Sequence, residues 1–519
     1  MVHPQTPVAP CSHEQGYKTP APMSCNHYQQ FHSRRDFLAK TGLGLGTAAL
    51  AQLLGRDAFA APASPSPPLS VSPSSATARA AGALPGLPHF APKAKRVICL
   101  FQSGGPSHLD LLDEKPVLRQ RFNEDLPDSI RRGQRITGMV ASQARFAVQP
   151  SKWDFKPGGK SGTVISDLLP HTRGIADEIC VIRSLHTEAI NHDPAITFFQ
   201  SGSQLPGRPS MGAWTDYGLG RLNDNLPSFV VLVSVNKTRA GQGLLARLWG
   251  SGFLPSQHQG VQFRAGGEPV LYLNDPPGLT RERRRLMLDG ITDLNRQQLA
   301  VSGDPEIETR ISQFEMAYRM QRGVPELMDL AGESAATLES YGTAVNEPGS
   351  FTRNCLIARR LAERGVRFIQ LYHRDWDHHG ALNEHLPRLA LDVDQASAAL
   401  IKDLKQRGLL DETLVIWGGE FGRTPYAQGD ANREKYGRDH HGKAFSIWMA
   451  GGGIKGGMTH GTTDDFGFNV VENPVHVHDL QATILHCLGI DHTRLTFKFQ
   501  GRQYRLTDVH GEVVKAILT

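Results

Sequence analysis

Several short apolar runs, rich in β-branched residues, alternate with longer stretches in which apolar residues recur at helical spacing. Charged residues or glycine-rich turns bound each run, which is typical of strands buried on both faces. The strand-like runs are Lys95–Phe101, Ile179–Leu185, Ser228–Val233, Val366–Tyr372, Thr413–Gly418 and Phe445–Ala450. The helical stretches are Ser166–Ile175, Pro194–Gln200, Leu382–Gln406 and His478–Leu488. This alternation predicts an α/β fold with a central, mostly parallel sheet flanked by helices.

One long segment, about residues 279–338, breaks the alternation because it is dense in Arg, Glu, Leu and Met and has no strand signal. Its spacing predicts two helices, Thr280–Ala300 and Asp304–Leu330, as a helical insertion in the domain. We interpret the basic run Arg281–Arg285 as a solvated helical face, with contact to an anionic substrate as the less favoured alternative.

The N-terminal region has the pattern of an export signal. Ser33–Lys40 contains a twin-arginine motif, an apolar stretch follows, and Ala58-Phe59-Ala60 fits a signal peptidase site. The apolar stretch is too short and too rich in glycine for a permanent membrane span. We expect residues 1–60 to be a signal peptide handled by the twin-arginine translocase, so that the protein is periplasmic or secreted. Residues 61–92, rich in Pro, Ser and Ala, are predicted to be a disordered linker before the domain at 93–519.

The composition of the chain argues against several kinds of partner and binding site. The net charge of +5 is small and dispersed, which argues against nucleic acid as a partner. Cysteines form no CxxC pair, which argues against a thiolate zinc site or a disulfide framework. The cysteines beyond the signal, Cys99, Cys180, Cys355 and Cys487, are predicted to be separate buried thiols.

Carboxylates and imidazoles follow the strand-like runs. Asp377 and His379 come after Val366–Tyr372, and Glu420 and Arg423 come after Thr413–Gly418. Loops at the carboxyl ends of parallel strands meet at one edge of a sheet, so these side chains can share a divalent cation. The alternatives are a solvated acidic turn around Asp377 and a local ion pair between Glu420 and Arg423. Arg423 also has the planar fork that suits a phosphoryl or sulfuryl group.

Two further loops carry candidate residues. Asp439 and His440 precede a strand-like run, so they reach the same edge only if the chain doubles back. The loop after Lys95–Phe101 carries Ser107 and Asp110; the Ser107 hydroxyl is at least as well placed to cap a helix as to act as a nucleophile.

The loop after Ile179–Leu185 offers a possible anion site. Asp193 and Pro194 fit an N-cap and a first helical residue, which places His192 beside a helix N-terminus, where it would face a phosphate or sulfate. Histidines also accumulate near the C-terminus, and we interpret His478 as a helix start and the others there as packing or surface residues.

In order along the chain, the segments SRRDFLAK, LFQSGGPSHLDLLDEKP, HTEAINHDPA, DWDHHG, GGEFGRTP, GRDHHG, AGGGIKGGMTHGTTDDFG and HDLQATILHCLGID resemble one protein family. It is the twin-arginine-exported domain-of-unknown-function family fifteen hundred and one, of the alkaline phosphatase and sulfatase superfamily. The resemblance implies a one- or two-metal site at the carboxyl edge of a mixed sheet, which hydrolyses phosphate or sulfate esters.

The resemblance also implies roles for individual residues. Asp377 and His379 resemble the Asp/His pair after a late central strand, Glu420 the carboxylate of the next strand, and His440 the last histidine ligand. Asp110 is the candidate for the carboxylate of the first strand, although the usual position holds Gln102 and Ser103. The Cys-x-Pro-Ser-Arg setting of the main sulfatases is absent from the sequence. An activated water, Ser107 or His192 would then replace the usual nucleophile, or catalysis has been lost.

These observations predict an exported, metal-dependent hydrolase of phosphate or sulfate esters, acting on a small molecule or a polysaccharide. The expected cofactor is a divalent metal (Zn, Ca, Mg or Mn). The alternative is a catalytically inactive relative that binds carbohydrate or the cell surface. The candidate catalytic residues are Ser107, His192 and Arg423, and the candidate metal ligands are Asp110, Asp377, His379, Glu420, Asp439 and His440.

Overall fold

The computed structural model describes residues 82–519, apart from residues 135, 236–242, 265–267, 271–272, 430 and 432–433. The predicted signal peptide and most of the predicted linker lie outside the described residues and stay predictions. Described residues ahead of position 93 already contact the domain, since the His89 N–H donates to the Gly489 carbonyl at 2.8 Å. Within the described ranges, no helix has both the length and the apolar character needed to cross a membrane.

The central sheet is mixed and mostly parallel, as the sequence predicts. Its order is β12–β4–β11–β8–β1–β7–β5–β6, and β15 pairs with β4. Only β11 runs antiparallel to its neighbours among these described strands. The strands are β1 (Arg96–Gln102), β4 (Ile179–His186), β5 (Phe229–Val233), β6 (Val261–Phe263), β7 (Phe368–His373), β8 (Thr413–Gly418), β11 (Phe445–Ala450), β12 (Met458–His460) and β15 (Val475–His476).

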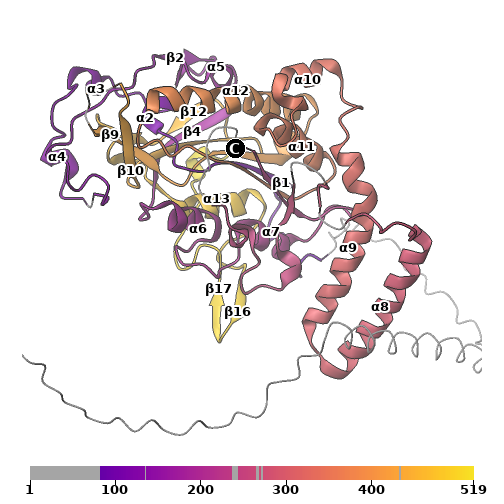
Figure 1. The fold of residues 1–519 in the computed structure, drawn as a ribbon. Coiled ribbons are helices and arrows are strands. Elements are labelled where there is room, and N and C mark those ends of the chain that lie inside the picture. Colours follow the sequence, from indigo (N-terminus) through magenta and orange to yellow (C-terminus); the bar gives the residue numbers. More distant parts are fainter. Residues whose placement is uncertain are drawn as a thin grey trace, which may run out of the picture. The chain divides into compact units, whose positions relative to one another are not determined.

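Helices cover both faces of this sheet (Figure 1). Ile98 and Leu100 of β1 pack on one face with the helices α11 (Phe351–Glu363) and α12 (Leu382–Gln406). Val97, Cys99 and Phe101 pack on the other face with the helices α6 (His192–Ser201), α7 (Met211–Leu219) and α13 (Val477–Cys487). Burial on both faces explains why the strands are continuously apolar rather than alternating. The predicted thiols Cys99, Cys180, Cys355 and Cys487 are buried and unpaired.

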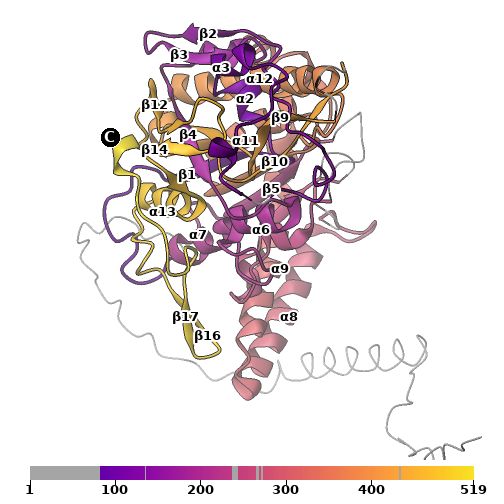
Figure 2. The ribbon, with the colours of Figure 1, turned by 90° about the vertical axis from the view of Figure 1, so that its left-hand side faces the viewer.

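The predicted insertion is confirmed as the antiparallel helices α8 (Arg281–Ser302) and α9 (Pro305–Met328), which lie side by side (Figures 1 and 2). Thr280 and Asp304 cap them with side-chain oxygens, and Gly303 takes the left-handed conformation that ends α8. Arg281 and Arg283 are exposed, which agrees with a solvated face.

The helix predicted over Ser166–Ile175 is largely wrong. Strand β3 (Thr163–Ser166) leads into the short helix α5 (Pro170–Arg173). Leu169, which precedes Pro170, has a non-helical backbone, because a proline disfavours the α conformation of the preceding residue.

The remaining elements are mostly short. They are α2 (His108–Leu111), α3 (Pro116–Gln120), α4 (Asp128–Arg131), β2 (Phe155–Gly158), α10 (Ala335–Tyr341), β9 (Gly422–Gln428), β10 (Gly437–His441), β13 (Thr462–Thr463), β14 (Val470–Glu472), β16 (Phe497–Phe499) and β17 (Arg502–Tyr504). The antiparallel hairpin of β9 and β10 connects β8 to β11 and carries Arg423 and His440.

Candidate metal centre

Separate parts of the sheet deliver side chains to one place. Asp377 and His379 follow the carboxyl end of β7, and His192 follows that of β4 as the first residue of α6. His440 comes from β10, which precedes β11. Because β11 is antiparallel to the other strands of the sheet, its amino end lies at the edge where the parallel strands have their carboxyl ends. A segment ahead of this strand therefore reaches the same edge as the loops that follow β4 and β7.

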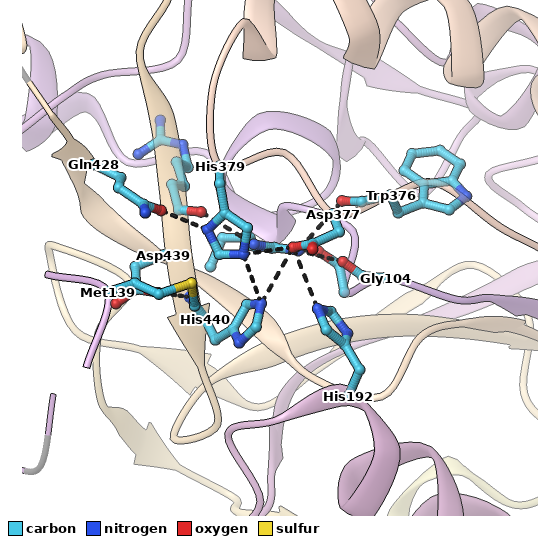
Figure 3. A network of polar contacts seen from close by, with 12 residues as sticks. Gly104, Met139, His192, Trp376, Asp377, His379, Gln428, Asp439 and His440 are labelled. Carbon is cyan, nitrogen blue, oxygen red and sulfur yellow. Dashed lines mark hydrogen bonds and ion pairs between the residues drawn. The ribbon is translucent and has the colours of Figure 1, made fainter. Parts of the chain in front are cut away.

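The four residues His192, Asp377, His379 and His440 each present one ligand atom, and these atoms all lie within 4.8 Å of one another. The three histidine rings are directed at the carboxylate of Asp377 (Figure 3). Its Oδ1 lies 3.3 Å from His192 Nε2, 2.8 Å from His379 Nε2 and 3.2 Å from His440 Nε2. The Nε2 atoms of His379 and His440 are 3.0 Å apart.

The other nitrogen of each ring faces an oxygen. His192 Nδ1 lies 2.6 Å from Glu420 Oε1, His379 Nδ1 lies 2.5 Å from Gln428 Oε1, and His440 Nδ1 lies 2.8 Å from the carbonyl of Ile190. Since these oxygens accept hydrogen bonds, each Nδ1 carries the hydrogen and each neutral ring keeps its lone pair on Nε2. Metal-binding histidines are typically held in this way.

When no cation is bound, a proton on an imidazole Nε2 lets that ring donate to the Asp377 carboxylate. The pKa values of the cluster reflect the competition between this attraction and burial. Burial by itself would lower the pKa of His192, but the carboxylates of Asp377 and Glu420 outweigh burial and raise it. Burial, assisted by the charge of Arg423, lowers the pKa of His440 to about 3. Burial opposes ionisation of Asp377, yet the three histidines and Arg423 hold its pKa far below the usual value.

The donor set fits a borderline divalent cation. Imidazole nitrogens suit Zn²⁺ and similar transition metals, whereas Ca²⁺ and Mg²⁺ prefer sites made mainly of oxygen ligands. The cluster is also accessible from one side, because the side chains of Asp377 and His379 are 28% and 25% exposed. The residues present therefore fit a metal to which a further small ligand can gain access.

Glu420 and Arg423 lie beside this cluster and support it. Glu420 is 1% exposed, and its carboxylate accepts hydrogen bonds from His192 and from the Gly104 N–H at 2.9 Å. Arg423 donates to Asp377 Oδ1 at 2.7 Å and to the carbonyls of Gly104, Gly105 (2.8 Å) and Arg438 (3.1 Å). The sequence analysis expects Glu420 to be a metal ligand; in the structure its carboxylate faces His192 and Gly104. It expects Arg423 to hold a phosphoryl or sulfuryl group; in the structure most of its donors bind Asp377 and backbone carbonyls.

Asp110 and Ser107 are not part of the cluster. The carboxylate of Asp110 pairs with Arg438 at 2.8 Å, and both side chains are fully buried. The Ser107 hydroxyl donates to Asp110 Oδ2 at 2.5 Å. Ser107 precedes α2 as its N-cap residue, but its side chain makes no capping hydrogen bond there. In the structure, the candidate ligand Asp110 and the candidate nucleophile Ser107 therefore both belong to a buried network around the Asp110–Arg438 ion pair.

Asp439 is also turned away from the three histidines. Its Oδ2 accepts from the Thr137 hydroxyl at 2.5 Å, and its Oδ1 accepts from the His440 N–H at 2.8 Å. His192 lies at the N-terminus of α6, and its ring nitrogen belongs to the cluster, although the sequence analysis did not include it among the candidate metal ligands. Helix α6 begins at His192 with Asn191 as N-cap, so the expected cap at Asp193 is wrong.

Sequence reasoning missed the groups that orient the histidines. Gln428 lies on β9 and the Ile190 carbonyl lies in the loop ahead of α6. Neither position carries a signal in the sequence, because a lone glutamine and a backbone carbonyl fit any polar strand or loop.

Comparisons with known proteins give low similarity to solved structures. The phosphonate monoester hydrolase SpPMH from Silicibacter pomeroyi matches with 14% identity over 62% of this chain and 68% of that chain, with a TM-score of 0.30. The PsFucS1 sulfatase from Pseudoalteromonas sp. matches with 12% identity over 77% and 68%, with a TM-score of 0.31. The alkaline phosphatase from the Antarctic bacterium TAB5 matches with 11% identity over 71% and 95%, with a TM-score of 0.26. Similarity at these levels carries no inference about activity.

Among curated proteins, no match was found. A family model, in contrast, covers most of the domain. The model described as "Protein of unknown function (DUF1501)" matches residues 94–518, and the chain therefore belongs to this family.

Proposed function

We propose that this protein is an exported, metal-dependent hydrolase of phosphate or sulfate esters. The observation that carries the proposal is the convergence of three imidazole Nε2 atoms and the Asp377 carboxylate at an accessible edge of the sheet. His192, Asp377, His379 and His440 would hold the cation, with Zn²⁺ as the favoured identity. When bound, such a cation lowers the pKa of water toward neutrality and offsets charge on the departing oxygen.

The protein's own residues prepare this site. Glu420 and Gln428 hold the rings of His192 and His379 by their Nδ1–H groups, and Arg423 fixes the Asp377 carboxylate. The formal charges of Asp377, Glu420, Arg423 and a divalent cation sum to a positive value, which favours an anionic substrate. Because Ser107 is bound to Asp110, we assign the attack on the ester to water rather than to this hydroxyl.

The test is turnover by the mature chain, reconstituted with Zn²⁺ or Mn²⁺, on aryl phosphate, aryl phosphonate and aryl sulfate esters. The double variant Asp377→Ala/His379→Ala should lose the metal and at least about a hundredfold of the turnover, because a catalytic metal supplies several kcal/mol. His385→Ala is the matched control, since His385 lies nearby in α12 and is not in the cluster. Equal turnover by the double variant would contradict the proposal.

A second candidate, a catalytically inactive protein that binds carbohydrate or the cell surface, is favoured by one observation. Most donors of Arg423 are engaged by backbone carbonyls and Asp377, and its side chain is buried, so this cation is poorly placed to hold a substrate anion. Bound metal with no turnover across the ester panel would support this candidate over the hydrolase.

A further inference from the structure

A second group of histidines surrounds a cavity beside the loop that joins β4 to α6. The cavity has a volume of about 280 Å³ and is lined by Glu188, Phe198, His476, His478 and His510. These residues come from the β4–α6 loop, from α6, from the start of α13 and from the C-terminal segment. The sequence analysis expects packing or surface roles for the histidines near the C-terminus, and their convergence was not predicted.

The histidine rings contact one another in a chain. The rings of His476 and His478 are nearly parallel, with centroids 5.2 Å apart, and His510 approaches His478 at 5.1 Å. His186 approaches His476 at 5.2 Å. A hydrophobic core has no need for so many imidazoles in contact, since each must find partners for two ring nitrogens.

His478 is 3% exposed and is held in a fixed orientation. Its Nδ1 lies 3.0 Å from the carbonyl of Thr507, which fixes the hydrogen on this nitrogen and the lone pair on Nε2. The ring lines the cavity, and its Nε2 has no hydrogen-bond partner among the described residues. A backbone carbonyl orients His440 of the first centre in the same way.

His476 already pairs with a carboxylate at the cavity. Its Nε2 lies 3.0 Å and 3.1 Å from the two carboxylate oxygens of Glu188. Its Nδ1 accepts the backbone N–H of His478 at 3.2 Å, so the hydrogen of the neutral ring is on Nε2 and points at Glu188. A cation bound at Nε2 would gain an imidazole nitrogen and a carboxylate oxygen together, once the ring proton moves to Nδ1 and the hydrogen bond from the His478 N–H is given up.

We propose that His476, His478, His510 and Glu188 form a second binding site, for a borderline divalent cation of the Zn²⁺ type. In the described part of the chain only the first centre has its ligand atoms within 4.8 Å of one another. Closure of the second site therefore requires a change of rotamer at Glu188, which is paired with His476, and at His510; both side chains are exposed. The proposal does not depend on the hydrolase activity.

An ion in this site would join three segments that are distant in sequence: the β4–α6 loop through Glu188, the start of α13 through His476 and His478, and the C-terminal segment through His510. The same β4–α6 loop leads to His192 of the first centre. Binding should therefore stabilise the fold as well as the loop that carries a ligand of the first centre.

The test isolates the second site in the full mature chain with Asp377→Ala/His379→Ala, freed of metal by a chelator and then dialysed against Zn²⁺. We expect one equivalent of zinc in this double variant and a zinc-dependent rise of its thermal midpoint. Adding His510→Ala should weaken this binding at least about tenfold. His510 is exposed, so its removal tests ligation without opening the core.

His478→Ala in the same background removes the oriented ligand, and His171→Ala, at an exposed histidine of α5, is the matched control that should leave the affinity unchanged. Two outcomes would overturn the second site: no zinc bound by the double variant, or zinc affinity unchanged by both His510→Ala and His478→Ala.

Discussion

The acceptor that faces each imidazole Nδ1 determines what the opposite nitrogen can do. In the first centre these acceptors differ in charge: Glu420 offers a carboxylate to His192, Gln428 a neutral amide oxygen to His379, and Ile190 a backbone carbonyl to His440. A carboxylate makes the ring that it faces a more basic ligand than a neutral acceptor does. His192 is therefore the ligand whose strength depends most on a neighbouring side chain.

Replacing Glu420 with glutamine tests this dependence. Glu420→Gln keeps an oxygen for the Gly104 N–H and for His192 but removes the negative charge. We expect the affinity for Zn²⁺ to fall about 10- to 100-fold, with little change in folding, as measured by equilibrium dialysis. Glu178→Gln, at a glutamate that pairs with Lys405 on the surface, is the control and should have no effect. Complete loss of the metal would instead indicate that Glu420 is itself a ligand.

At the scale of elements, the hairpin of β9 and β10 carries His440 to the cluster and is held by one buried ion pair. Arg438 of β10 pairs with Asp110 of α2, and its other donors bind the carbonyls of Thr424 and Gln149 at 3.0 Å. A buried guanidinium that loses its carboxylate is left with an uncompensated charge. The pair therefore contributes to the stability of the hairpin, and neither of its residues belongs to the cluster of candidate ligands.

The variant Asp110→Ala should reduce the free energy of unfolding by about 3–5 kcal/mol, as measured by urea denaturation. The folded variant should still bind metal at saturating Zn²⁺, because Asp110 is not among the clustered ligands. Asp167→Ala is the comparison: its partly exposed pairs with Lys156 and Arg173 should be worth no more than about 1 kcal/mol each. Normal stability with loss of metal from Asp110→Ala would restore Asp110 as a ligand.

Elements could be predicted where one physical signal dominated. Three elements have the bounds that their sequence pattern predicts: the strands Thr413–Gly418 and Phe445–Ala450 and the helix Leu382–Gln406. The two strands are buried on both faces, and the helix buries one long apolar stripe. The position of Asp377 and His379 at the sheet edge was likewise predicted from a strand end, whereas His440 was expected there only if the chain doubles back. The roles of Asp110 and Glu420 were not predicted. A carboxylate that follows a strand has the same sequence pattern whether its partner in the fold is a cation, an arginine or an imidazole.

At the scale of the whole molecule, the candidate metal ligands are spread over the chain from His192 to His440, so the native sheet must form before they meet. Histidines that are buried as neutral rings also make the stability of the fold depend on pH, because they take up a proton more readily in the unfolded chain. His373, at the end of β7, is 2% exposed, and its Nδ1 lies 2.8 Å from the hydroxyl of Ser234. Burial, together with the charge of Arg374, lowers the pKa of His373 from 6.5 to about 3.

Because the pKa of His373 is lower in the folded state, the unfolded chain takes up the proton first as the pH falls below about 6.5. His373 therefore contributes a loss of stability on acidification that approaches about 1.4 kcal/mol per pH unit, or about 2 kcal/mol by about pH 5. His373→Gln keeps a polar side chain opposite Ser234 but cannot titrate. Urea denaturation of metal-free protein at about pH 7 and about pH 5 should show a smaller loss for this variant than for the native chain. An equal loss in the two proteins would mean that His373 is not held neutral by the fold.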